Sequence, residues 1–175
     1  MENIIEQVEG FYSIVKLKKF RQTPGVFFDV ITKSNLPDIG AIDRVVHVNN
    51  AVSPGPVEGV ERPWYMHPHQ EDNLMVLYGV RHVDLYSMKQ KKMLSFTVEP
   101  NRISSGGKVL YEGGCMLVWP RYVFHRIVSG EEGSASVNLA VHHEGLDFKT
   151  NFNIYDMDTS TGEYRVLREG HQDQF

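Results

Sequence analysis

Two histidines separated by one residue carry the clearest chemistry in this 175-residue chain. His67 and His69 flank Pro68, and Glu71 and Asp72 follow them closely. In an extended chain, residues i and i+2 point to the same side, and a residue before proline is kept out of the helical region. Imidazole nitrogens and carboxylate oxygens are ligands of divalent transition metals. The block therefore predicts the start of a metal site at the edge or rim of a sheet.

A second block, residues 114–125, has the sequence GCMLVWPRYVFH. A predicted strand ends at Pro120, and a turn carries the chain to His125. A histidine directly after such a turn would lie at the mouth of a barrel and complete a set of three histidines. Tyr122 occupies the turn and carries a phenol, so we assign it the role of a proton donor to substrate.

Together the two blocks resemble the motifs of the cupin family. The first motif is a histidine, any residue, a histidine, a glutamate after a short spacer, and a glycine. The second is a glycine, a proline, a glycine and a histidine, followed by an asparagine. The residues that match are His67, His69 and Gly79 in the first block and Gly114, Pro120 and His125 in the second. Tyr122 and Ser129 stand where the second glycine and the asparagine are usual, and the resemblance covers residues 59–142.

The acidic position of the first motif has three candidates. Counting back from Gly79 gives Asp72, whereas counting forward from His69 gives Asn73. Glu71 is the only glutamate in the block, and it fits neither count. We favour Asp72, with Glu71 as the alternative. The resemblance then implies one divalent metal ion (iron, manganese, nickel or zinc) bound by His67, His69, Asp72 and His125.

The rest of the sequence predicts the strands that would position these blocks. Short apolar or alternating segments are separated by turn residues, which is typical of an antiparallel sandwich or barrel. Residues 1–20 carry the only helical pattern, with Ile4, Ile5 and Val8 at helical spacing. The predicted strands are residues 25–32, 42–48, 74–88, 93–98, 116–119, 124–128, 136–142, 152–157 and 163–168.

We therefore expect an all-β protein built on a single cupin barrel, which is a double-stranded β-helix or jelly roll. Residues 1–40 would form an N-terminal arm packed on the barrel, and residues 41–145 the barrel itself. Residues 146–175 would form a C-terminal hairpin and tail. Antiparallel barrels with such arms often pair, so we also expect a homodimer.

The composition of the chain argues against some classes of binding partner. The formal net charge is −4, the pI is about 6.0, and no basic block is present, which argues against nucleic acid and anionic membranes. The N-terminus lacks the features of a signal peptide, and no window is apolar enough for a membrane helix. The single cysteine, Cys115, gives no sign of an oxidising compartment. We expect a cytoplasmic protein that binds a small molecule.

Three functions fit these residues. The first is a metal-dependent enzyme, of the isomerase or dioxygenase type, acting on a small polar metabolite. The second is metal-free, because residues 84–120 are distantly similar to sugar-nucleotide epimerases and ketoisomerases with the same barrel. There, His67 or His69 would act as a general base. The third is a barrel that binds a small ligand without turnover. Metal content separates the first from the second, and turnover separates both from the third.

Overall fold

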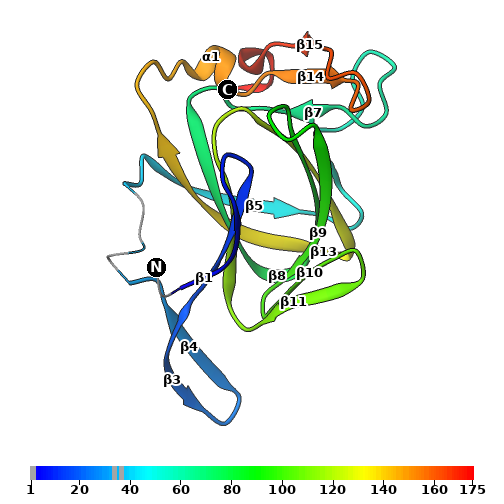
Figure 1. The fold of residues 1–175 in the computed structure, drawn as a ribbon. Coiled ribbons are helices and arrows are strands. Elements are labelled where there is room, and N and C mark those ends of the chain that lie inside the picture. The colour runs from blue at the N-terminus through cyan, green and yellow to red at the C-terminus, as the bar shows by residue number, and fades with distance from the viewer. Residues whose placement is uncertain (1–2, 33–34, 36–37) are drawn as a thin grey trace.

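The two longest strands, β8 (Gln70–Ser87) and β13 (Val123–His142), run antiparallel along most of their length and form the middle of a barrel (Figure 1). The structure is a computed structural model that describes residues 3–32, 35 and 38–175. Five further strands pair with these two. β12 (Cys115–Trp119) and β9 (Lys92–Glu99) pair with β8, whereas β5 (Ala41–His47), β6 (Val52–Ser53) and β7 (Trp64–Tyr65) pair with β13. The predicted all-β cupin barrel is confirmed.

Both long strands bend where two glycines cross. Gly79 and Gly133 have φ angles of 69° and 75°, which side chains rarely adopt. A Cβ at Gly79 would lie 2.0 Å from the backbone oxygen of Gly133. The pairing of β8 with β13 shifts register at this point, between Ser129 and Ser134. Because of the bend, the first part of β8 pairs with β12 and the second part with β9.

The described part of residues 1–20 forms strands, so the predicted helix is wrong. β1 (Ile4–Val8) and β2 (Tyr12–Lys16) make a hairpin, and β2 pairs with β12. Tyr12 and Ile14 are buried in β2, which is the two-residue period of a strand. β1 and β2 thereby extend the barrel sheet. The boundaries at residues 40 and 145 stay a prediction.

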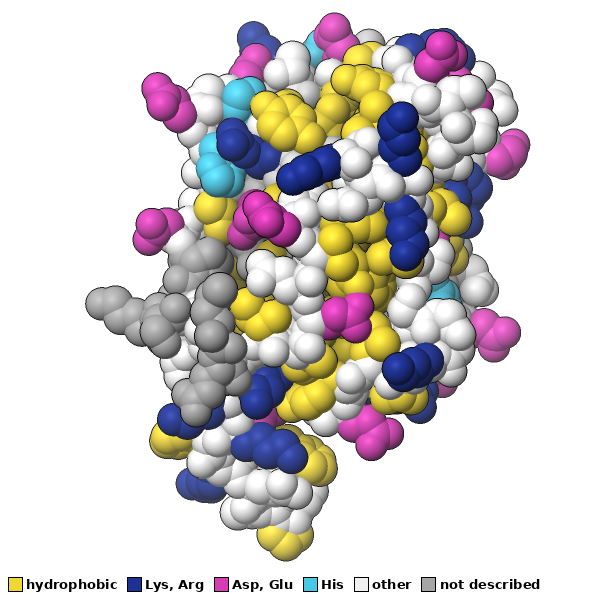
Figure 2. Space-filling view, in the orientation of Figure 1, with side chains coloured by type: hydrophobic (Ala, Val, Ile, Leu, Met, Phe, Trp, Pro, Cys, Tyr) yellow, Lys and Arg dark blue, Asp and Glu magenta, His cyan; other side chains and the backbone are white. Residues whose placement is uncertain are grey.

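A separate two-stranded hairpin extends away from the barrel (Figure 1). It consists of β3 (Lys18–Thr23) and β4 (Val26–Val30). Its hydrophobic side chains are exposed, and Figure 2 shows hydrophobic atoms at this lower end of the molecule. The large exposed residues are Phe20, Val26, Phe27 and Phe28.

The predicted C-terminal hairpin is confirmed as β14 (Ile154–Met157) paired with β15 (Tyr164–Arg168). It joins the barrel through β7 (Trp64–Tyr65) and a second, smaller core. A short helix, α1 (Phe148–Asn151), precedes the hairpin, and a 3-10 turn, η2 (Gly170–Asp173), follows it. No helix in the described part of the chain is long and apolar enough to cross a membrane.

The main core lies on the side of the barrel formed by β2, β8, β9 and β12. β10 (Arg102–Ser105) and β11 (Lys108–Glu112), which the pattern did not predict, extend this side beyond β9. Apolar side chains of these strands meet there and are removed from water. The largest members of this core are the aromatic residues Phe11, Tyr12, Phe96 and Trp119.

Candidate functional site

A cavity of about 700 Å³ lies inside the barrel between β5, β8 and β13. The alternation of β5 builds one wall, since Asp43, Val45 and His47 face the cavity. The alternate residues Ile42 and Val46 face solvent. Residues of α1 and η2 also contribute to the lining, so the C-terminal segment packs at this cavity.

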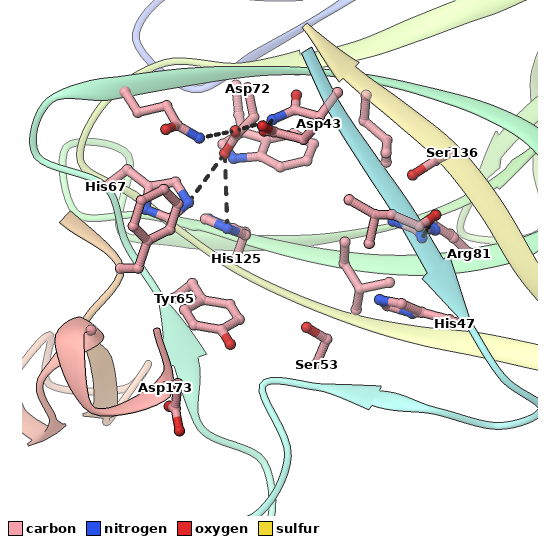
Figure 3. Close-up of a pocket in the computed structure, with 18 of the residues that line it drawn as sticks. Asp43, His47, Ser53, Tyr65, His67, Asp72, Arg81, His125, Ser136 and Asp173 are labelled. Atoms are coloured by element: carbon pink, nitrogen blue, oxygen red, sulfur yellow. Dashed lines mark hydrogen bonds and ion pairs between the residues drawn. The ribbon is translucent and has the colours of Figure 1, made fainter. Parts of the chain in front are cut away.

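Three of the predicted site residues meet in the wall of this cavity. His67 precedes β8, Asp72 lies on β8, and His125 lies on β13. All three are buried. Nε2 of His67 is 3.5 Å from Oδ2 of Asp72, and Nε2 of His125 is 3.9 Å from the same oxygen (Figure 3). One ligand atom from each residue lies within 4.8 Å of the other two.

The other ring nitrogen of each histidine contacts a backbone carbonyl. Nδ1 of His67 is 2.6 Å from the oxygen of Asn151, and Nδ1 of His125 is 3.3 Å from the oxygen of Val123. A carbonyl only accepts, so each Nδ1 carries the proton and each neutral imidazole presents a lone pair at Nε2. Two lone pairs and one carboxylate oxygen therefore face one another. Such a set of acceptor atoms attracts a positive charge, either a proton or a metal ion.

The Asp72 carboxylate is held from one side only. Its Oδ1 accepts hydrogen bonds from Nε2 of Gln70 at 2.8 Å and from Nδ2 of Asn138 at 2.6 Å, whereas Oδ2 has no hydrogen bond. Burial acts to raise the pKa of Asp72, but the two imidazoles and these two donors outweigh it and hold the pKa below its usual value. Asp72 is thus a carboxylate with one oxygen left for the histidines.

The imidazole of His125 is neutral near neutral pH and can accept a proton. Burial, and then the adjacent His67, lower the pKa of His125 to about 4, against the attraction of Asp72. Aromatic rings surround the two imidazoles: Trp119 lies 5.1 Å from His125 and Phe152 lies 5.0 Å from His67, between ring centroids. These rings keep water away from nitrogens that are neutral and able to accept a proton.

Four buried polar atoms lack a hydrogen-bond partner in the described part of the chain, and all four belong to residues that line this cavity. They are Asp72 Oδ2, His47 Nδ1, Trp119 Nε1 and Ser136 Oγ. Buried polar groups are rarely left unpaired, because each one costs free energy. Their concentration on one cavity indicates a surface built to bind a polar ligand.

The structure does not bring His69 into this group, which corrects the predicted four-ligand set. Nδ1 of His69 contacts the backbone oxygen of Glu144 at 2.8 Å. β8 begins only at Gln70, so the same-side rule for an extended chain does not hold at residues 67–69. On β8, Asp72 faces the cavity, whereas the alternatives Glu71 and Asn73 do not line it.

Tyr122 also lies outside the cavity, so its predicted role as proton donor is not supported by its position. It is 54% exposed, with a φ angle of 66° in the turn before β13. The phenol that does line the cavity belongs to Tyr65, 5.9 Å from His125 between ring centroids. Burial, and then the charge of Asp173, raise the pKa of Tyr65, so its hydroxyl stays protonated.

Sequence reasoning missed several cavity residues that lie far from the two blocks. Asp43, His47, Arg81 and Asn138 come from three different strands. Arg81 alone carried a usable signal, because it alternates with Val83 and Leu85 and so shares their buried face. The others reach the cavity only through strand pairing.

Comparison with solved structures bears on the fold. A dTDP sugar isomerase from Desulfovibrio desulfuricans matches with a TM-score of 0.54 and 18% identity, covering 81% of this chain and 83% of that chain. A sugar 3,4-ketoisomerase from Thermoanaerobacterium thermosaccharolyticum, solved in complex with TDP, matches with a TM-score of 0.51 and 17% identity. The match covers 80% of this chain and 85% of that chain. A 3,4-ketoisomerase from Helicobacter canadensis matches with a TM-score of 0.50 and 13% identity, covering 76% of this chain and 86% of that chain.

No family model matches the chain, and no curated protein matches it. The fold is a cupin barrel. Identities this low show a shared fold, whereas activity depends on the residues of the site.

Proposed function

We propose that this protein is an isomerase that moves a proton between neighbouring carbons of a keto sugar. The observation that supports this function is the convergence of three buried acceptor atoms, from His67, Asp72 and His125, in the wall of the cavity. Acceptors of this kind take a proton from carbon next to a carbonyl. The barrel shared with three sugar isomerases supports the same reaction class.

The proposed reaction begins at a neutral imidazole. Nε2 of His67 or His125 takes the proton from the hydroxyl-bearing carbon beside the carbonyl, and the carbonyl becomes an enediolate. The same imidazolium then returns the proton to the carbon that carried the carbonyl oxygen. The hydroxyl proton moves in the same direction, from the oxygen on C3 to the oxygen on C4, so a 4-keto sugar becomes a 3-keto sugar with no net change in atoms.

Asp72 and Tyr65 stabilise the two charged groups of this reaction, the protonated imidazole and the negative oxygen of the enediolate. Asp72 Oδ2 faces both imidazoles and stabilises whichever one has taken up the proton. Tyr65 keeps a protonated hydroxyl in the same cavity and donates a hydrogen bond to the oxygen that becomes negative. The sequence predicted His67 or His69 as the base, and in this mechanism the alternative to His67 is His125 instead of His69.

The first substrate class to test is a keto sugar attached to dTDP. One structural neighbour is a dTDP sugar isomerase, and another was solved with TDP. The test offers a dTDP-linked 4-keto sugar to the purified, tag-free protein and follows the sugar protons by NMR. The proposal expects a 3-keto product. Binding of the sugar without product indicates a binding barrel and contradicts the enzyme proposal.

A metal-dependent enzyme is the second candidate, because the same three residues fit a divalent ion. Two imidazoles and one carboxylate form a nitrogen-and-oxygen donor set, and each imidazole is oriented by a backbone carbonyl at its other nitrogen. A metal held by His67, Asp72 and His125 would supply Lewis acidity toward a carbonyl oxygen. In that case Asp72 and the histidines bind the ion rather than carry a proton.

Metal content separates the two candidates. The tag-free protein is measured for iron, manganese, nickel and zinc per chain, then dialysed against a chelator and assayed again. Turnover that survives removal of the metal supports the proton mechanism. Turnover that is lost with the metal and restored by one of the four ions supports the second candidate.

A further inference from the structure

Arg81 is a buried cation at a different part of the cavity. It lies on β8 facing the cavity, with 2% of its surface exposed. Its Nε donates to Oγ of Ser134 at 3.0 Å and its Nη2 to the backbone oxygen of Val45 at 3.2 Å. Among the described residues, no carboxylate lies within ion-pair distance of it. A buried charge without an opposite charge is costly, so a compensating anion is expected.

Two of the four unpaired atoms of the cavity lie on residues of the same region. Ser136 follows Ser134 by two residues on β13 and is buried, with a free hydroxyl. His47 ends β5 and has an unpaired Nδ1. Ser134, which Arg81 contacts, pairs with His47 across β13 and β5. Burial, and then the charge of Arg81, lower the pKa of His47 to about 4. Burial lowers the pKa of Arg81 to about 10, so it stays charged near neutral pH.

This group is separated from the histidines and Asp72. Figure 3 shows Arg81, His47 and Ser136 together, away from His67 and Asp72. Asp43 belongs to the other group, because Asn138 donates to both Asp43 and Asp72. His47 lies four residues beyond Asp43 on β5, which is roughly 13 Å along a strand. The cavity therefore has an acidic end at Asp43 and Asp72 and a cationic end at Arg81.

We propose that Arg81, Ser136 and His47 form an oxyanion subsite that binds a carboxylate or phosphate group of the ligand. Guanidinium binds such groups through several parallel hydrogen bonds, and a hydroxyl and a neutral imidazole add donors. Carboxylates at the other end repel an anion, so they orient the ligand with its reacting carbon at His67 and His125. The orientation rests on the proposed function, whereas anion binding at Arg81 does not.

The separation of the two ends limits the ligand. A sugar acid and a sugar phosphate each carry an anionic group for Arg81 on the same molecule as a ring carbon that can react at His125. The diphosphate of a nucleotide sugar supplies the same oxyanion chemistry from a second source. Both sources use the same donors, and direct binding measurements distinguish them.

The test measures binding of inorganic phosphate, glucuronate, glucose 6-phosphate and dTDP to the wild-type chain by isothermal titration. We expect at least one of them to bind, and Arg81→Met to weaken its binding roughly tenfold to a hundredfold, as for loss of a charged hydrogen bond. Ser136→Ala should weaken it roughly threefold to tenfold. Tighter binding of dTDP than of the sugar acid and the sugar phosphate identifies the diphosphate as the source, and the reverse order identifies the sugar's own anion.

Arg44→Met is the matched control, because Arg44 lies on the exposed face of β5 and should leave binding unchanged. Ser136→Ala removes a hydroxyl that has no partner, so this variant keeps the test open if Arg81→Met does not fold. Absence of binding by every probe, or equal binding by wild type, Arg81→Met and Ser136→Ala, overturns the subsite. Loss of turnover after substitution of His67 bears on the isomerase alone, so the two failures are distinguishable.

Discussion

Nε2 of His67 lies 3.5 Å from Oδ2 of Asp72, and that oxygen has no hydrogen bond. The second oxygen of the same carboxylate is held by Gln70 and Asn138. Asp72 is therefore fixed in place by one oxygen and presents the other, charged and unpaired, to two imidazoles. In the proposed mechanism this oxygen stabilises the protonated imidazole. Catalysis should therefore depend on the negative charge of Asp72 more than on the size of its side chain.

Asp72→Asn separates charge from shape. The amide oxygen still accepts from Gln70 and Asn138, while its NH₂ group can donate to Nε2 of His67. We expect the variant to unfold with a free energy equal to that of wild type or up to about 1 kcal/mol higher, because a new hydrogen bond replaces an unpaired oxygen. Turnover should fall roughly a hundredfold or more, because the protonated imidazole loses its counter-charge.

Denaturant unfolding and turnover of the same preparations check this prediction. Glu71→Gln is the control, since Glu71 lies on the neighbouring position of β8 but does not line the cavity. An Asp72→Asn variant that turns over at the wild-type rate would show that the charge of Asp72 has no part in the reaction.

Tyr65→Phe tests the phenol that lines the cavity. The side chain keeps its ring beside His125, and only the hydroxyl that donates to substrate is lost. We expect kcat to fall roughly tenfold to a hundredfold while the fold is unchanged, as for loss of one transition-state donor. Tyr122→Phe is the matched control, because Tyr122 is exposed in the turn before β13. Equal losses in the two variants would contradict the placement of Tyr65 as the donor.

The cationic end of the cavity should make stability depend on pH. The pKa of His47 is lowered to about 4 by burial and by Arg81, below its ordinary value of 6.5. The unfolded chain therefore binds more protons than the folded chain between these values, and the free energy of unfolding falls as pH drops from 6.5 to about 4. Denaturant titrations across this range should show a smaller fall for His47→Asn than for wild type. A fall of unchanged size would show that His47 does not contribute.

Gly79→Ala tests the crossing of the two long strands. The added Cβ would meet the backbone oxygen of Gly133, and the φ angle of 69° adds the strain of a left-handed residue. We expect the free energy of unfolding to fall by about 3 kcal/mol or more. Gly59→Ala isolates the strain alone, because Gly59 has a φ angle of 82° with open space around it, and about 1 kcal/mol is expected. Equal losses at the two positions would contradict the close crossing.

The exposed β3–β4 hairpin bears on the expected homodimer. A two-stranded hairpin is marginally stable alone, and here Phe20, Phe27 and Phe28 are exposed on it. If a second copy covers these rings, light scattering after gel filtration should give a dimer mass for wild type and a monomer mass for the Phe20→Ser, Phe27→Ser double variant. Val46→Ser, on the outer face of β5, should leave the mass unchanged. A monomeric wild type would contradict the expected dimer.

The barrel was predictable because its signals are local. Strands with turn residues between them mark most of the sheet, and Gly79 and Gly133 mark the bend of the two long strands. A helix was wrongly predicted in the first twenty residues, because apolar spacing over so short a segment fits a helix and a strand equally well. The segment forms a strand because β2 pairs with β12, and the sequence of neither segment predicts that pairing.

The site was predictable in part. His67, Asp72 and His125 meet as the two sequence blocks suggested, and the alternation of β8 selects Asp72 over its neighbours. His69 does not join them, because the chain bends before β8 begins at Gln70. The partners that orient the site, such as the carbonyl of Asn151 and the amide of Asn138, come from distant segments and required the three-dimensional structure.

The most direct test of the account follows the proton itself. Wild type, His67→Asn and His125→Asn, each treated with a chelator, are mixed in D₂O with a dTDP-linked 4-keto sugar, and NMR follows exchange at the carbon beside the carbonyl. The account predicts exchange by wild type and a loss of at least about a hundredfold in one histidine variant. Wild-type exchange rates in both histidine variants, or no exchange by wild type, would contradict it.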